Sequence, residues 1–187
     1  MPQTVDIILA IILFIILLPL LLILWLVSVI DCRHRGIFIQ KRVGKNAVLF
    51  DIYKFETFRD GKVTQVGAML RKFKLDELPQ LFNIIKGDMA FVGPRPDLPG
   101  YYDALKGEDR ILLKLRPGLT SLAAIKYIDE EKLLSHKLNA QSYNDEIIFR
   151  DKIRINKLYL REKSIMNDIK IMVKTIKIIL IRKKTSL

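Results

Sequence analysis

The chain contains an uncharged and almost entirely apolar stretch over residues 7–30, which only Pro19 and Ser28 interrupt. As a helix with a rise of about 1.5 Å per residue, this stretch would be roughly 36 Å long. The hydrocarbon core of a bilayer is about 30 Å thick, so such a helix would be long enough to cross it. We therefore predict a membrane-embedded segment at residues 1–30.

The remaining residues, 31–187, are predicted to form one cytoplasmic domain. All 32 Lys and Arg residues follow position 30 and the formal net charge is +12, so the positive-inside rule places this part in the cytoplasm. A cleaved secretory signal fits poorly, because no Lys or Arg precedes the apolar stretch, which is also too long for a signal. The single cysteine, Cys32, excludes an internal disulfide and fits a reducing compartment.

Pro19 divides the apolar stretch into two halves. A proline inside a helix removes a hydrogen bond and clashes with the preceding turn, and each half would be only about 16–18 Å long. One interpretation is a single kinked span. The other is a re-entrant helix-break-helix that enters and leaves the membrane by its cytoplasmic face. Because proline occurs in many ordinary spans, the residues alone favour the single span.

The domain is predicted to be of α/β type, mostly helical with one small β-hairpin. Two segments rich in β-branched and aromatic residues, 36–43 and 47–55, flank a turn at 44–46. Gly87 suits the C-terminal cap of a preceding helix. Helices are predicted at residues 66–72, 76–86 and 106–115, and over most of the chain from residue 129 onward.

The last predicted helix, residues 165–182, is basic and amphipathic. It is rich in Ile, Met, Val and Leu, and Lys170, Lys174 and Lys177 recur at helical spacing. A helix of this kind can lie in a membrane interface. The alternative, a helix packed on the core with a solvated lysine stripe, is equally compatible with the pattern.

Two adjacent carboxylates, Asp76 and Glu77, stand at a predicted helix start. In a first turn they can border one pocket, where free N–H groups and the helix dipole favour negative charge. A carboxylate there can bind Mg²⁺, attack phosphorus as a nucleophile or accept a proton. The alternative is an ordinary helix start with an acidic first turn, which these two residues favour when taken alone.

Arg95 lies between Pro94 and Pro96, which restrict the backbone on both sides of it. The guanidinium therefore loses less entropy on binding, and it can grip a phosphate with two hydrogen bonds. Arg116, followed by proline and glycine, repeats this arrangement more weakly, and Lys54 is a further candidate for diphosphate contact. Taken singly, Arg95 is better explained as a solvated arginine in a rigid surface turn, and Lys54 as an ordinary strand-edge lysine.

Several kinds of site are excluded by the sequence. It has no His/Cys cluster with zinc spacing, no Gly-x-Ser-x-Gly nucleophile elbow and no Walker-type or dinucleotide-binding glycine loop. The chemistry therefore depends on carboxylates, arginines and a hard cation.

Taken together, the motifs resemble the bacterial sugar transferase family, the small monotopic phosphoglycosyl transferases. The resemblance covers nearly the whole chain, and its order makes it specific, so it favours a functional interpretation of Asp76, Glu77 and Arg95. The matching segments are residues 5–10, 38–44, 50–55, 75–83, 86–96 and 116–121, followed by Tyr159, Ser164 and Asp168.

The resemblance implies transfer of a sugar-1-phosphate from a UDP-sugar to a polyprenol phosphate, expected to be undecaprenyl phosphate, with release of UMP. This would be the first membrane step of glycoconjugate assembly, such as lipopolysaccharide or capsule, at the cytoplasmic face of the bacterial inner membrane. The resemblance also implies a re-entrant N-terminal helix broken at Pro19, and it allows a homodimer. Nucleic acid is not an expected partner.

For the site, the resemblance implies that Asp76 is the nucleophile and forms a phosphosugar-aspartyl intermediate. Glu77 would be its dyad partner, either in binding Mg²⁺ together with Asp76 or in activating the acceptor. Arg95 would bind phosphate. The further substrate-binding residues expected on this basis are Lys54, Arg116, Pro94 and Pro96.

The chain departs from the family pattern at Glu56, where a basic residue is usual. This charge reversal favours an alternative function, a non-catalytic membrane-surface scaffold of the same fold, whereas Asp76 and Glu77 favour an enzyme. A basic nucleic-acid binder would explain the charge of +12 but not residues 7–30, and no stacking motif supports it.

Overall fold

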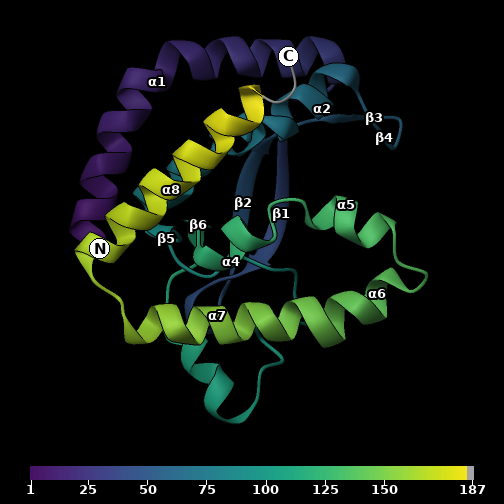
Figure 1. The fold of residues 1–187 in the computed structure, drawn as a ribbon. Helices are drawn as coiled ribbons and strands as arrows, with labels where there is room; N and C mark the ends of the chain where they lie inside the picture. Colours follow the sequence, from purple (N-terminus) through teal and green to yellow (C-terminus); the bar gives the residue numbers. More distant parts are fainter. Residues whose placement is uncertain (185–187) are drawn as a thin grey trace.

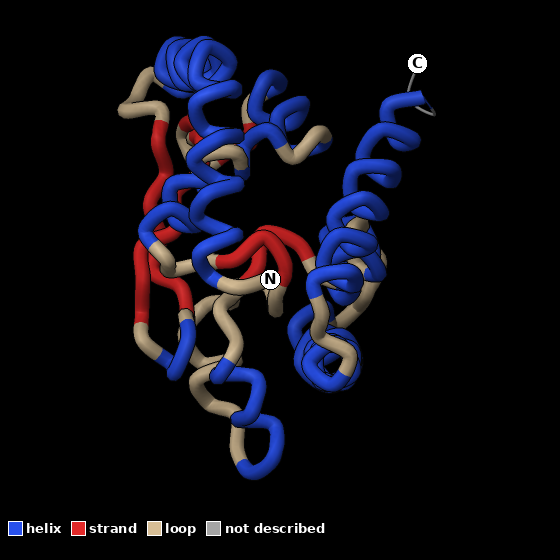
Figure 2. Tube along the Cα trace, turned by 90° about the vertical axis from the view of Figure 1, so that its left-hand side faces the viewer, coloured by secondary structure: helices blue, strands red, loops and turns tan. Residues whose placement is uncertain are grey.

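The long apolar stretch forms one helix, α1 (Gln3–Cys32), in a computed structural model that describes residues 1–184, with side chains up to Ile181. Figures 1 and 2 show α1 bent into two arms, one rising from the N-terminus and one crossing the top of the molecule. Proline is a usual cause of sharp helix bends, and α1 contains Pro19. The break predicted at Pro19 is thus a bend within a continuous helix.

Most of the surface of α1 is apolar and uncovered by protein. It is the one described helix that is long and apolar enough to cross a membrane. Ile15, Ile16 and Ile30 are 64%, 66% and 75% exposed, and exposed apolar surface of this extent marks a membrane or partner interface. The side chains that α1 buries are Asp6, Ala10, Leu21, Leu24, Ser28 and Cys32.

The predicted β-hairpin is confirmed. Strands β1 (Ile37–Val43) and β2 (Leu49–Phe55) pair antiparallel, with the short helix η1 (Lys45–Ala47) at the turn. The other edge of β2 is covered by Asn83, whose Nδ2 donates to the carbonyl of Asp51 at 2.6 Å. Its Oδ1 accepts from the N–H of Tyr53 at 3.1 Å. This side chain therefore completes the hydrogen bonding of the strand edge.

The helix predicted at residues 66–72 is confirmed as α2 (Gln65–Lys72), preceded by the small hairpin β3 (Phe58–Arg59) and β4 (Lys62–Val63). The single helix predicted at residues 76–86 is wrong in part. A 3-10 turn, η2 (Leu75–Glu77), comes first, and α3 (Gln80–Lys86) follows it. Pro79 has no N–H for the carbonyl of Leu75, which instead accepts from the N–H of Leu78 at 3.2 Å. Gly87 caps α3 in the left-handed conformation, as predicted.

The segments around Arg95 and Arg116 meet in a short parallel sheet that the sequence did not predict. Strand β5 (Ala90–Val92) pairs with β6 (Gly118–Thr120), and η3 (Gly107–Lys114), a 3-10 helix, lies between them in the chain. The backbones cross so closely at Gly93 and Gly118 that a Cβ on Gly118 would lie 2.1 Å from the nitrogen of Gly93. Only glycine fits this crossing.

The rest of the described chain is largely helical, as predicted. Figure 1 shows α7 crossing the lower part of the molecule, and Figure 2 shows α8 standing apart from α1 on the opposite side of the molecule. The elements are α4 (Leu122–Lys126), α5 (Glu130–Ser135), α6 (Ala140–Tyr143), the π-turn η4 (Asn144–Ile148), α7 (Phe149–Arg161) and α8 (Ile165–Lys184).

Helix α8 packs on the protein by one face and leaves its other faces exposed. One face packs on the protein through buried Asp168 and Ile171. A second face exposes an apolar stripe, and Lys170, Lys174 and Lys177 form an exposed stripe beside it. The exposed apolar residues of α8 are Ile165, Met166, Ile169, Val173, Ile176, Leu180 and Ile181.

A buried ion pair joins the start of α1 to β5 and β6. Arg116 donates to Asp6 Oδ2 at 2.8 Å and to the carbonyl of Met89 at 3.1 Å. Asp6 Oδ1 accepts from the N–H of Phe91 at 3.3 Å. The side chains of Asp6 and Arg116 are only 1% and 13% exposed, so each charge depends on the other for its compensation.

Removing one partner of this pair should therefore be costly. We expect Asp6→Leu to lower the free energy of unfolding by about 3–5 kcal/mol, because it leaves the Arg116 guanidinium buried without its counter-charge. Adding Arg116→Met should recover most of the loss. Thermal and urea unfolding in detergent, followed by circular dichroism, measures both effects.

The exposed pair Lys41–Asp51, at 2.9 Å, is the matched control. Asp51→Asn should cost less than about 1 kcal/mol, as is usual for surface ion pairs. Equal losses for Asp6→Leu and Asp51→Asn would contradict a structural role for the buried pair.

Candidate functional site

One cavity of about 1090 Å³ brings together four of the predicted site residues, Lys54, Asp76, Glu77 and Arg95. One side of the cavity is formed by the β1–β2 hairpin, α2 and η2. The other side is formed by α4, α5, α7 and α8. Residues far apart in the sequence thus share one space between the two halves of the molecule.

The two carboxylates are held by the short turn η2 rather than by a regular helix. Lys74, in the left-handed conformation with φ 57°, precedes η2, and Pro79, the N-cap residue of α3, lies two residues after its end. Asp76 and Glu77 are 8% and 5% exposed. The turn therefore buries both adjacent side chains.

Glu77 is surrounded by positive charge. Arg95 donates to its two oxygens at 2.5 and 3.2 Å, and Lys54 Nζ lies 3.7 Å from Oε1. Burial opposes the charge of Glu77, but Arg95 and Lys54 outweigh it and hold the pKa of this carboxyl well below its usual range. Burial also lowers the pKa of Lys54, against the attraction of Glu77. Glu77 is therefore an ionised anchor for two cations.

Asp76 has the opposite environment. Its Oδ1 is buried and has no hydrogen-bond partner among the described residues. Burial, and then the neighbouring charge of Glu77, raise the pKa of Asp76. One oxygen is thus free to meet a ligand, and an unpartnered oxygen of this kind is what a nucleophile or a metal ligand requires.

The predicted magnesium site fits Asp76 better than Glu77. No group of three or more His, Cys, Asp or Glu residues that could hold a metal occurs in the described part of the chain. Mg²⁺ is commonly held by one or two carboxylates together with water and substrate phosphate oxygens. The free oxygen of Asp76 suits such a site, whereas both oxygens of Glu77 are already paired with Arg95.

The other predicted site residues, Pro94, Pro96 and Arg116, do not line this cavity. Pro94 and Pro96 direct their carbonyls into the fold, where they accept from the N–H of Gly118 at 2.8 Å and from Arg42 at 3.5 Å. Arg116 does not line the cavity and is occupied by the ion pair with Asp6 described above.

The unusual Glu56 lines the cavity, where its carboxylate lies 2.8 Å from Nδ1 of His34. Its backbone carbonyl accepts from Ser28 of α1 at 2.7 Å. Both the side chain and the backbone carbonyl of Glu56 therefore have a partner in the structure.

Sequence reasoning missed several polar residues of the cavity, among them Arg42 and Asn156. Arg42 donates to Gln40 Oε1 at 2.6 Å, and its Nε is buried without a partner among the described residues. The alternation of β1 places Gln40 and Arg42 on one face of the hairpin, so the pattern of period two could have identified Arg42. Asn156 comes from α7, and no local signal marks it.

The comparisons with known proteins agree with these motifs. A family model described as bacterial sugar transferase matches residues 1–182. The undecaprenyl-phosphate galactose phosphotransferase of Salmonella typhimurium is 29% identical, over 96% of this chain and 40% of that protein. The UDP-glucose:undecaprenyl-phosphate glucose-1-phosphate transferase of Caulobacter vibrioides is 31% identical, over 93% of this chain and 67% of that protein.

The galactosyl transferase CpsE of Streptococcus agalactiae serotype III is 32% identical, over 78% of this chain and 35% of that protein. The chain therefore spans between 35% and 67% of the length of these three relatives.

The opposite environments of the two carboxylates predict opposite effects on stability. Because folding raises the pKa of Asp76, its ionisation destabilises the folded state at neutral pH. We expect Asp76→Asn to raise the melting temperature at pH 7 by about 2–4 °C, which corresponds to ~1 kcal/mol in a chain of this size. The gain should shrink as pH falls toward ~4 and vanish below pH ~3, where the carboxyl is protonated in both states.

Glu77→Gln provides the comparison, since it removes the charge that compensates Arg95 and Lys54. It should lower the melting temperature at pH 7, and the loss should shrink as pH falls. Thermal unfolding of both variants across this pH range tests the assignment. A change of the same sign in both would contradict it.

Proposed function

The chain belongs to the bacterial sugar transferase family, and on that premise we propose that it transfers a sugar-1-phosphate from a UDP-sugar to undecaprenyl phosphate. The observation that carries this proposal is the free, buried oxygen of Asp76 beside the cations Lys54 and Arg95 in one cavity. A nucleophile next to paired cations suits attack on a diphosphate, whose charge the cations offset.

The transfer takes place in two displacements. In the first, Asp76 attacks the sugar-bearing phosphorus of the donor, the bond to the bridging oxygen breaks, and UMP leaves with the electron pair. In the second, a phosphate oxygen of undecaprenyl phosphate attacks the same phosphorus and displaces Asp76. The products are undecaprenyl-diphosphate-sugar and UMP, and Asp76 is restored.

Arg95 and Glu77 act together in this scheme. The guanidinium uses two of its five N–H groups on Glu77, so three remain for phosphate oxygens. The flanking prolines and the two bonds to Glu77 fix the direction of the guanidinium, which reduces the entropy lost when phosphate binds. Glu77 is a positioning residue in this arrangement.

Mg²⁺ is proposed as the cofactor, held by Asp76 and by oxygens of the substrate. When bound, it would offset charge on the diphosphate and on the departing UMP. Lys54 and Arg42 would supply further positive charge on the hairpin side of the cavity.

The acceptor is a lipid, and the cavity has a suitable apolar part. Leu13 of α1 and Met172, Ile176 and Ile179 of α8 line it. We propose that the isoprenoid chain enters between α1 and α8 while its phosphate reaches Asp76. The bent α1 would lie in the cytoplasmic leaflet, and the apolar and lysine stripes of α8 would lie at the interface.

The reaction is tested by UMP release from a panel of UDP-sugars with undecaprenyl phosphate, in the presence of Mg²⁺ or EDTA. We expect release with at least one donor, dependent on Mg²⁺, and a loss of about a thousandfold or more in Asp76→Asn. With donor labelled at the sugar-bearing phosphate and no acceptor, label should remain on the wild-type protein but not on Asp76→Asn.

Asp51→Asn serves as the surface control in the same assay. Release that is unchanged in Asp76→Asn would contradict the nucleophile. No release from any donor, together with retained membrane binding, would favour the non-catalytic scaffold.

The bent, re-entrant placement of α1 has its own test. In a Cys32→Ala background, cysteines at the exposed positions Thr4 and Lys62 lie on either side of the apolar stretch 7–30. Neither Thr4→Cys nor Lys62→Cys should react with an impermeant maleimide added to intact cells, and both should react after permeabilisation. Labelling of Thr4→Cys alone in intact cells would indicate a single span instead.

A further inference from the structure

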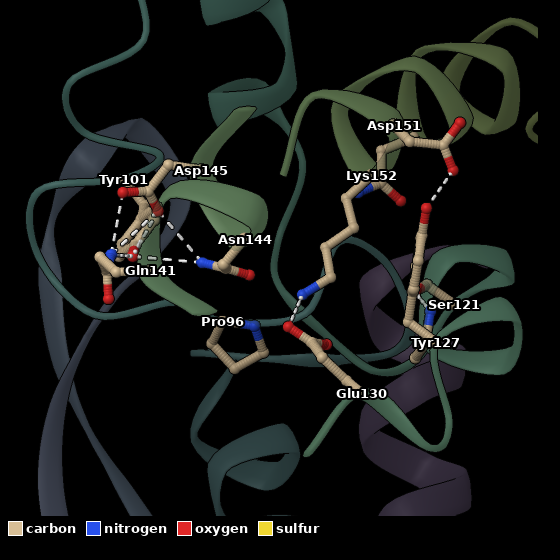
Figure 3. Close-up of polar contacts among 12 residues, drawn as sticks. Pro96, Tyr101, Ser121, Tyr127, Glu130, Gln141, Asn144, Asp145, Asp151 and Lys152 are labelled. Carbon is tan, nitrogen blue, oxygen red and sulfur yellow. Dashed lines mark hydrogen bonds and ion pairs between the residues drawn. The ribbon is translucent and has the colours of Figure 1, made fainter. Parts of the chain in front are cut away.

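The cavity contains a second group of polar side chains that the proposed transfer does not use. We call it the Asn156 lobe, and Figure 3 shows part of it, with Lys152 of α7 reaching Glu130 at the start of α5. The lobe consists of Asp97, Tyr102, Glu130, Lys152 and Asn156, all of which line the cavity.

Asn156 has a polar atom that lacks a partner. The side chain is 1% exposed, and its Nδ2 donates to the hydroxyl of Tyr102 at 2.8 Å. Its Oδ1 has no hydrogen bond among the described residues. A buried acceptor without a partner is costly, and most such atoms in proteins are satisfied. An unsatisfied acceptor on a cavity wall therefore indicates a ligand that donates to it.

This atom is one of a set that traces the cavity. Four buried side-chain atoms lack partners in the described part of the chain. Three of them belong to residues that line the same cavity, namely Asp76, Arg42 and Asn156. Two acceptors and one donor in the same cavity thus lack a hydrogen-bond partner. This is expected of a site for a polar ligand that has both donor and acceptor groups.

The lobe is rich in acceptors. The carboxylate of Asp97 has no hydrogen bond among the described residues, and burial raises its pKa against the attraction of Lys152 and Arg42. The carboxylate of Glu130 is held by Lys152 at 2.7 Å. Uracil offers a single N–H donor and the ribose a pair of hydroxyls, whereas the hexose of the donor offers more hydroxyl donors than either. Acceptors on Asn156, Asp97 and Glu130 match the sugar better.

We propose that the Asn156 lobe binds the sugar of the donor and that Asn156 accepts a hydrogen bond from one of its hydroxyl groups. The inference rests on the proposed function. Only Pro96 separates Asp97 from Arg95 in the chain, so a sugar attached to a phosphate on Arg95 lies within reach of the lobe. Asn156 is then a specificity-determining residue, because it rewards a hydroxyl in one position of the ring.

The test compares Asn156→Ala with Asn144→Ala. Asn144, the first residue of the π-turn η4, is a matched control. Its Nδ2 donates to the hydroxyl of Tyr101 at 3.3 Å, as Asn156 does to Tyr102, but Asn144 does not line the cavity. Donors are UDP-glucose, UDP-galactose and their N-acetylamino counterparts, which differ at single ring positions. The readouts are kcat/KM for each donor, inhibition by UMP, and the melting temperature.

We expect Asn156→Ala to lower kcat/KM for the preferred donor about five- to tenfold, the effect of one lost hydrogen bond. For donors that lack the hydroxyl, kcat/KM should fall little, so the ratio of kcat/KM between the preferred donor and the others should decrease. Inhibition by UMP should not change. Asn156→Asp, which keeps an acceptor at this position, should retain the order of preference. Asn144→Ala should behave as wild type.

Three results would overturn the proposal. An equal loss of kcat/KM for all donors would indicate a structural role for Asn156. Weaker inhibition by UMP would place uracil in the lobe. Values of kcat/KM that do not change for any donor would leave Asn156 outside the site. Failure of the proposed function is distinguished by calorimetry on Asp76→Asn. If wild type releases no UMP, the lobe is tested by binding alone. Asp76→Asn should then bind UDP-sugars more tightly than UDP, and adding Asn156→Ala should abolish that difference. Equal affinity of Asp76→Asn for UDP and UDP-sugars would refute the lobe.

Discussion

The arrangement of the site depends on the hydrogen bonds that the buried carboxylate of Asp6 accepts. Asp6 lies in the first turn of α1 and accepts from Arg116 and from the backbone of Phe91. Those two partners belong to the paired segments whose close crossing at Gly93 precedes Arg95. The position of α1 and the direction of the Arg95 guanidinium are therefore set by one connected group of residues.

A second buried carboxylate performs a similar task at the start of α8. Asp168 accepts from the hydroxyl of Tyr159 at 2.6 Å, and that hydroxyl also lies 3.3 Å from the carbonyl of Val92 in β5. Helices α1 and α8, which both carry extensive exposed apolar surface, are thus fixed by polar contacts to the same short sheet. Directional contacts of this kind can fix an orientation that apolar packing alone would leave loose.

Much of the fold and part of the site could be predicted from the sequence, because they depend on local patterns. The apolar helix, the hairpin and α2 follow from periodicity and turn residues, and Asp76 and Glu77 were recognised from their motif. The partner of Arg116 could not be predicted, since Asp6 lies 110 positions away. The same is true of Asn156, which shares the cavity with Asp76 only after α7 has packed. Local pattern also overestimated the helix at Asp76, where a missing N–H at Pro79 imposes a 3-10 turn.

The apolar flank of the cavity, between α1 and α8, has a kinetic consequence. Under the proposed function, one substrate arrives from water and the other by diffusion within the plane of the bilayer. The acceptor concentration that governs the rate is then its mole fraction in the lipid, not its amount per volume of solution. Adding inert lipid at constant total acceptor would slow the reaction by dilution in two dimensions, although nothing in the aqueous phase had changed.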